Sequence, residues 1–139
     1  MNLEEIAYYD LIVLARALHE ARFPKKYNDP AIWGAPFVIQ LHCDVWDEVW
    51  RRDEIPDPLA NEKIRAWLQW KGRDEHGTVL NRIRESLDLS RMVLEDPQIM
   101  KDYLRPFIVD EESMADFRRV AAETVVRTSS CYGSVDTQN

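Results

Sequence analysis

Two ionisable residues could do acid–base chemistry from positions where a helical pattern predicts hydrocarbon side chains. Asp10 falls inside the apolar face of one predicted helix, and His42 falls in the middle of the apolar arc of the next. A carboxylate that orients an imidazole can make a histidine a general base. A buried polar group without a partner is costly, so we predict that Asp10 and His42 pair with each other. The simpler role of such a pair is to fix the helix register.

No nucleophile or metal motif accompanies this pair. Cys43 follows His42 directly, but neighbouring residues of a helix point about 100° apart, which disfavours a Cys–His dyad. Asp44, Asp47 and Glu48 lie on the polar side of the same helix, and paired carboxylates of this kind could hold Mg²⁺. The next helix lacks a matching acidic motif. Phosphate-loop, dinucleotide, zinc-protease and nucleophile-elbow motifs are also absent, so the sequence predicts no catalytic residue, metal or cofactor.

The elements that position these residues are all predicted to be helices. Apolar residues recur at helical spacing, no clean alternating strand is visible, and proline or glycine marks the breaks. We predict helices over 3–23, 36–54, 57–71 and 78–95, a short helix within 96–107, and a last helix from 110. The expected fold is all-α, a compact bundle of five to six helices.

One domain accounts for most of the 139 residues. We assign residues 1–128 to a single helical domain. The segment from residue 129 to 139, SSCYGSVDTQN, is small and polar, and we predict a disordered C-terminal tail there.

The chain is rich in tryptophan, with five in all. Trp46 and Trp50 are four residues apart on one predicted helix, and Trp67 and Trp70 are three apart on the next. An aromatic core between these two helices is the simpler interpretation. Tryptophans that line a groove would instead indicate a binding function, because aromatic residues are enriched at interfaces.

Net charge, hydropathy and cysteine content exclude further classes of function. The formal net charge of −7 lacks the basic footprint of a phosphate-binding surface, so we expect no direct nucleic-acid binding. No apolar run approaches the roughly 20 residues that span a bilayer, so we expect no membrane insertion. Two cysteines without a CxxC motif fit a reducing compartment, and we predict a cytoplasmic location.

The proline-rich segment over 24–36 offers a candidate interaction surface. It reads as an irregular loop, and loops of this length are uncommon and often functional. Its aromatic side chains precede the acidic side of the next helix, which would attract a basic partner. The predicted partner-binding residues are Tyr27, Trp33, Asp44, Asp47 and Glu48.

We therefore expect a small acidic intracellular protein that binds and modulates a protein partner, as an inhibitor, an immunity protein or a regulatory subunit. The alternative is a small-molecule-binding or metal-dependent helical enzyme that uses Asp10 and His42, or the carboxylates of the 36–54 helix. An enzyme needs a concave pocket with converging polar groups, whereas a binding protein needs an exposed patch. Self-association stays open.

Overall fold

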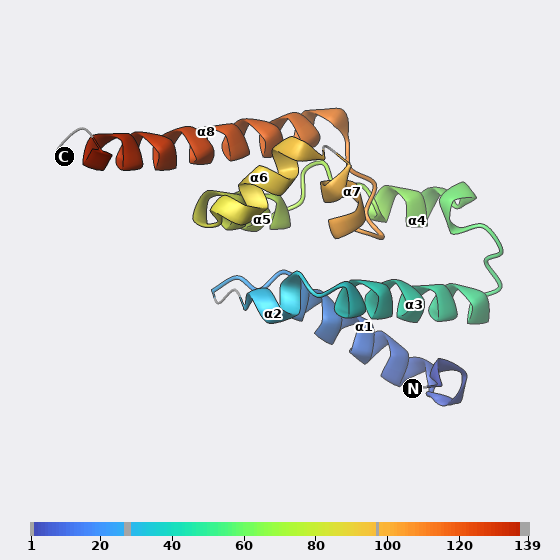
Figure 1. Cartoon of the computed structure of the whole chain (residues 1–139). Helices are drawn as coiled ribbons and strands as arrows, with labels where there is room; N and C mark the ends of the chain where they lie inside the picture. Colours follow the sequence, from blue (N-terminus) through green and yellow to red (C-terminus); the bar gives the residue numbers. More distant parts are fainter. Residues whose placement is uncertain (1, 27–28, 97, 137–139) are drawn as a thin grey trace. The chain divides into compact units, whose positions relative to one another are not determined.

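The computed structural model describes residues 2–26, 29–96 and 98–136, and the predicted all-α class is confirmed (Figure 1). No β-strand occurs in these ranges, where Gln69 and Ile108 form an isolated parallel bridge. The elements are the 3-10 helix η1 (Leu3–Glu5), α1 (Tyr8–Arg22), α2 (Pro30–Trp33), α3 (Pro36–Arg52), the 3-10 helix η2 (Pro58–Ala60), α4 (Glu62–Trp67), α5 (Glu75–Glu85), α6 (Leu87–Glu95), α7 (Ile99–Tyr103) and α8 (Glu111–Asp136).

Two of the predicted helices are divided in the structure. The first begins as η1, because the side chain of Asn2 accepts a hydrogen bond from the Glu4 amide, and extended backbone at Ile6 delays α1 until Tyr8. The predicted 78–95 helix breaks at Ser86, whose extended backbone and side-chain bond to the Leu89 amide start α6. The short polar side chain of Ser86 competes with helix continuation in this way.

Two other predicted boundaries also differ. The predicted loop over 24–36 contains α2, which begins where the Asp29 side chain caps the Ala31 amide. The predicted 57–71 helix becomes η2 followed by α4, with Asn61 as the cap of α4. At the other end, α8 continues past residue 128 to Asp136, and the last three residues of the predicted tail lie outside the described residues.

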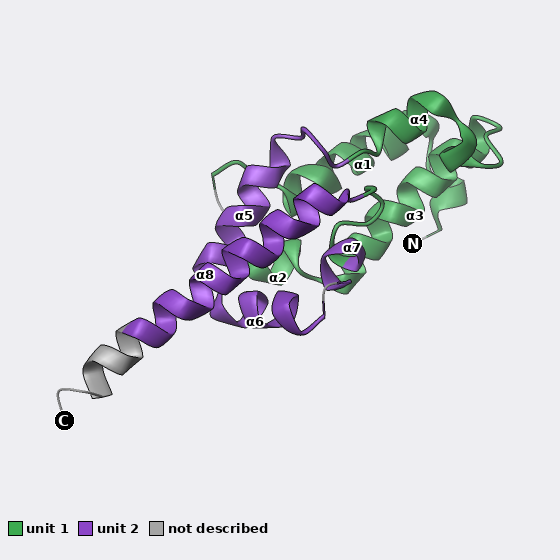
Figure 2. Cartoon of the chain, turned by 90° about the horizontal axis from the view of Figure 1, so that it is seen from above, with its two compact units in different colours: residues 1–69, 103–108 green, residues 70–102, 109–139 purple. Residues whose placement is uncertain are grey.

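The chain forms two compact units, which are described separately (Figure 2). Unit 1 comprises Met1–Gln69 and Tyr103–Ile108. Unit 2 comprises Trp70–Asp102 and Val109–Asn139.

In unit 1, α1 packs along α3 and an aromatic cluster joins α3 to α4. The rings of Trp46 and Trp67 meet edge to face with centroids 4.8 Å apart, and Trp46 stacks on Trp50 at 5.9 Å. The predicted aromatic contact between these helices is therefore confirmed. Residues 103–108 return to this unit, where the Ile108 amide donates to the Leu68 carbonyl at 2.8 Å and Phe107 lies 6.0 Å from Trp67.

In unit 2, α5 and α6 both pack against α8. Its core is made of apolar side chains at helical spacing: Val79 and Ile83 of α5, Leu89 and Val93 of α6, and Phe117, Val120 and Ala121 of α8. The Ser90 hydroxyl donates to the Ile83 carbonyl at 2.7 Å and ties α6 to the end of α5.

Candidate binding surface at the C-terminal end of α3

α3 ends in a turn with an unusual backbone conformation. The Ile55 amide donates to the Trp50 carbonyl at 2.9 Å, and the Glu54 amide donates to the Arg51 carbonyl at 3.1 Å. These two bonds define a Schellman motif, which needs a left-handed residue just after the helix. That residue is Glu54, with φ of 59°, although glycine adopts this conformation with less strain.

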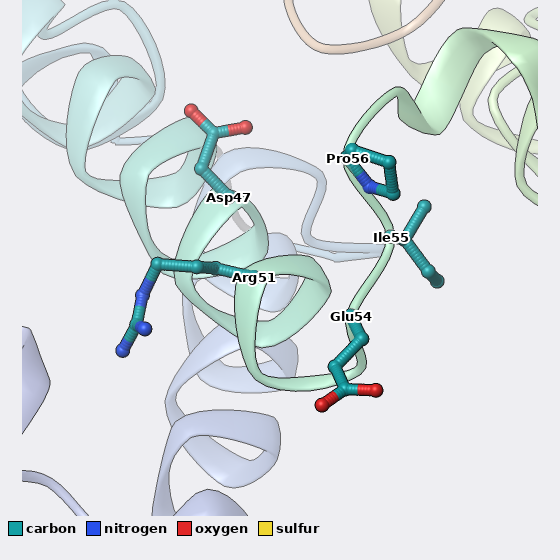
Figure 3. Close-up of a pocket in the computed structure, with 5 residues that line it drawn as sticks. All are labelled: Asp47, Arg51, Glu54, Ile55 and Pro56. Carbon is teal, nitrogen blue, oxygen red and sulfur yellow. The ribbon is translucent and has the colours of Figure 1, made fainter.

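A hollow of about 610 Å³ lies at this turn. Asp47 and Arg51 line it from α3, one helical turn apart, and Ile55 and Pro56 line it from the segment that follows (Figure 3). Glu54 stands at the bend, and the guanidinium of Arg51 is directed away from Ile55 and Pro56. The hollow therefore combines an apolar surface with two carboxylates.

Glu48 lies beside the hollow and is neutralised by two arginines. Arg51 donates to it from Nε at 2.8 Å and Nη2 at 2.6 Å, and Arg52 donates from Nε at 2.9 Å. These bonds lower the pKa of Glu48 to about 2. Glu48 is buried, so the expectation that it lies on the solvent-exposed side of the helix is corrected. The arginines three and four residues later fold back over it.

The other two predicted carboxylates of α3 are exposed, as expected. Asp44 accepts a hydrogen bond from Gln40 at 2.8 Å. Partial burial and the nearby charge of Asp44 raise the pKa of Asp47. Within the part of the chain that the structure describes, no residue pairs with the carboxylate of Asp47 or of Glu54. These two groups therefore present negative charge to solvent.

The N-terminal turn packs against the same end of α3. Arg52 donates from Nη2 to two carbonyl groups of η1, at 2.9 and 3.1 Å. The Tyr8 hydroxyl donates to Asp53 at 3.2 Å, and this bond raises the pKa of Tyr8. Tyr8 and its neighbour Tyr9 are both exposed, Tyr9 by 75%. Aromatic and acidic side chains thus share this end of unit 1.

Of the two predicted aromatic site residues, only Trp33 lies in the described part of the chain. Tyr27 lies outside the described residues. Trp33 ends α2 and is half-buried, with its ring edge to face with Tyr103 at 5.5 Å. Trp33 does not line the hollow, so the structure gives it a packing contact within unit 1.

His42 is fully buried, as predicted, but its partners are different. Arg22 contacts its Nδ1 from Nη1 at 2.9 Å, and the indole Nε1 of Trp46 contacts its Nε2 at 3.2 Å. Asp10 is exposed in the first turn of α1, so the predicted Asp10–His42 pair is wrong. Asp10 and Arg22 lie about 18 Å apart along the helix axis, and the Arg22 end of α1 is the one that reaches His42.

Both neighbours of His42 are hydrogen-bond donors. A neutral imidazole accepts at one nitrogen only, so one of these two contacts at a time is a hydrogen bond to His42. Burial and the charges of Arg22 and His19 lower the pKa of His42 to about 3, which keeps the ring neutral near pH 7. With both nitrogens facing protein donors, His42 has a structural role.

A second histidine, His76 in unit 2, forms a network that the sequence analysis did not identify. The Trp70 indole donates to Nδ1 of His76 at 2.9 Å, and Nε2 lies 3.0 Å from Asp116. Because an indole can only donate, Nδ1 accepts and Nε2–H donates to Asp116. Both ring nitrogens are used, which makes this contact a structural one as well.

A smaller hollow of about 340 Å³ lies next to His76 and carries both signs of charge. Lys71 and Glu112 line it and pair with each other at 3.4 Å. Ser113 also lines it, but its hydroxyl and its amide both donate to the carboxylate of Asp110, which caps α8. The polar groups named here serve local structure.

No metal site is formed by the described residues: no three histidine, cysteine, aspartate or glutamate side chains gather closely enough to bind an ion. None of the helices in the described ranges is both long and apolar enough to cross a lipid bilayer. No protein-family model, curated protein or solved structure matches this chain.

Proposed function

We propose that this chain binds a protein partner with a basic surface through the acidic end of unit 1, and thereby modulates that partner. The observation that carries the proposal is that Asp47 and Glu54 are exposed beside an apolar surface and have no ion-pair partner among the described residues. An acidic patch speeds the encounter with a basic partner and disfavours acidic ones.

The local charge balance supports this choice of partner. The segment from Asp44 to Asp57, both included, contains six acidic and two basic residues. Both basic residues, Arg51 and Arg52, bind the buried Glu48. The negative end of the α3 dipole points toward the same turn and adds to the negative potential there.

Exposed tyrosines next to the acidic turn supply apolar contact area. Tyr8 is held in place by its bond to Asp53, and Tyr9 lies on the regular helix α1. Tyrosine is enriched in interfaces, and a side chain that is already ordered loses less entropy on binding. The surface therefore offers both charge and aromatic anchors.

The enzyme alternative receives no support from the geometry of His42, whose ring nitrogens both face protein donors. A cytoplasmic location and an inhibitory or regulatory role remain part of the proposal. Cys43 carries a free thiol, which fits a reducing compartment.

Affinity capture with a matched charge reversal tests the proposal. Asp47→Lys combined with Glu54→Lys changes the charge of the binding surface. Asp88→Lys combined with Glu95→Lys makes the same change in net charge, at the same spacing, on exposed positions of α6 in unit 2. We expect a protein captured by the original chain and by the α6 variant, but not by the α3 variant.

Circular dichroism establishes that both variants remain folded before the comparison. If the α3 variant captures the same protein to the same extent, the proposed surface is wrong. If the original chain retains a metabolite and captures no protein, the partner-binding function is wrong.

A further inference from the structure

The first turns of α1 expose an apolar ridge. Tyr9 and Val13 are exposed by 75% and 48%, and Ala17 is exposed as well. The three residues are spaced four apart, so they form one row along the helix, opposite the buried Leu11 and Ala15. Rows of this spacing are the ridges that fit into the grooves of another helix. The opposite side of α1 packs against α3, so the exposed ridge is free to contact a helix of another molecule.

Carboxylates surround the N-terminal end of this ridge. The Tyr8 hydroxyl donates to Asp53 at 3.2 Å, and this bond brings the end of α3, with Glu54, next to the start of α1. Glu5 lies in η1 just before α1, Asp10 lies in the first turn of α1, and both are exposed. Glu5, Asp10 and Glu54 have no ion-pair partner in the part of the chain that the structure describes. The ridge therefore begins in a region of negative charge.

The neighbouring dipoles and cations leave this charge negative. The positive end of the α1 dipole and the negative end of the α3 dipole lie at the same end of unit 1, so their fields partly cancel. Arg51 and Arg52 bind Glu48. Arg16 is exposed beside Val13, one turn further along α1, and it repels basic groups there. The attraction for a basic group is therefore strongest at the start of α1.

We propose that this ridge binds an amphipathic helix of the protein partner, with apolar side chains against Tyr9 and Val13 and basic side chains over the carboxylates at the start of α1. The inference rests on the proposed function, and it names the segment by which the partner is recognised. Charge complementarity argues for the basic side chains. The regular row of exposed residues argues for a helix, because helices pack by fitting ridges into grooves.

Three synthetic peptides test the ridge without the partner. The first is helical, with leucine at every third or fourth position and lysine on the flanking positions of one end. The second replaces each lysine with glutamate, and the third keeps the composition of the first but scrambles its order, so that the apolar row is lost. Each is titrated into the full chain labelled with ¹⁵N while amide chemical shifts are recorded. We expect only the first peptide to move the amides of residues 8–17 in a saturable way.

Serine variants test the apolar part of the ridge. Tyr9→Ser combined with Val13→Ser should weaken binding of the first peptide roughly tenfold, because both apolar contacts are lost. Met92→Ser combined with Val126→Ser removes two exposed apolar side chains from unit 2, and it should leave the affinity nearly unchanged. Circular dichroism establishes that both variants keep their helices.

Amide variants test the charged part. Glu5→Gln combined with Asp10→Asn should weaken binding of the first peptide roughly two- to fivefold, the range for exposed ion pairs. Asp88→Asn combined with Glu95→Gln makes the same change in net charge on exposed positions of α6 and should have little effect.

Three results with the peptides would overturn the inference. Equal binding of the scrambled peptide would show that the apolar ridge is not recognised. Equal binding of the glutamate peptide would show that the carboxylates do not select a basic helix. The absence of saturable shifts on α1 with the first peptide would show that the ridge binds no such helix.

The captured partner separates this inference from the proposed function. If the Asp47→Lys/Glu54→Lys variant loses the partner while Tyr9→Ser/Val13→Ser binds it as tightly as the original chain, the ridge is not the recognition element and the proposed function stands. If neither variant changes capture, the proposed binding surface is wrong as well.

Discussion

Arg22 contacts Nδ1 of the buried His42 at 2.9 Å, and this contact joins the last turn of α1 to the middle of α3. The same guanidinium donates to the carbonyl groups of Arg105 at 2.6 Å and Tyr103 at 2.8 Å. One buried cation therefore holds three separate segments of unit 1 together. The stability of this junction depends on several N–H donors of one guanidinium, which few other side chains could supply.

Replacing Arg22 with methionine should destabilise the protein strongly. The change keeps a long side chain but leaves the carbonyls of Tyr103 and Arg105 without these donors. We expect the free energy of unfolding to fall by about 2–4 kcal/mol, from unsatisfied buried acceptors. Urea denaturation measures the change, with Arg16→Met on the exposed side of α1 as the control. Equal stability of the two variants would show that the buried contacts contribute little.

His42 should make folding sensitive to moderately acidic pH. Its pKa is about 3 in the folded protein and 6.5 in the unfolded chain, so the unfolded state binds the proton first as pH falls. Its contribution is fully present above pH 6.5 and declines between there and about pH 3, by at most about 1.4 kcal/mol per pH unit. The stability difference between the original chain and His42→Gln should narrow over this range. A difference that stays constant from pH 7 to pH 4 would contradict the assignment.

Glu48 should titrate far below an ordinary glutamate. Hydrogen bonds from Arg51 and Arg52 lower its pKa from 4.5 to about 2. The ionised form is favoured by folding, so its contribution is present above pH 4.5 and is lost as pH falls toward 2. NMR titration of the side-chain carboxyl carbon measures the midpoint directly, and Arg51→Gln should raise it. A midpoint near 4.5 would mean that the arginines do not cover Glu48 in solution.

Glycine at position 54 should stabilise the fold. Glu54 occupies the left-handed region, which costs an ordinary residue about 1 kcal/mol and glycine much less. We expect Glu54→Gly to raise the free energy of unfolding by up to about 1 kcal/mol. Glu54→Ala separates this effect from the loss of charge, because alanine keeps the strain. If thermal denaturation shows the same gain in stability for the alanine and the glycine variant, the left-handed backbone at position 54 is not the cause.

Helical periodicity was sufficient to predict the class of fold and the aromatic contact between Trp46 and Trp67. Both depend on which face of a helix is apolar, and that information is local. The break at Ser86 was missed because a side-chain cap interrupts a periodic pattern there without proline or glycine. The break at Ile6 and Ala7 was missed because extended backbone interrupts the first helix there with no side-chain cap hydrogen bond. Capping by Ser86 could have been recognised from residue type.

The site was harder to predict than the fold. Periodicity placed Asp10 and His42 on apolar faces, but it contains no information about which turn of α1 lies against which turn of α3. It assigned Glu48 to the polar side, where the arginines three and four residues later cover it. The bend at Glu54 gave no signal, because glutamate is an uncommon residue for a left-handed position.

The dissociation constant of the complex with the captured partner shows whether the acidic end of α3 contacts that partner. Isothermal titration calorimetry compares the original chain, the Asp47→Lys/Glu54→Lys variant and the Asp88→Lys/Glu95→Lys variant at low and moderate salt. We expect binding at least about tenfold weaker for the α3 variant, an affinity for the original chain that falls with added salt, and little change for the α6 variant. Equal dissociation constants for the original chain and the α3 variant would contradict this expectation.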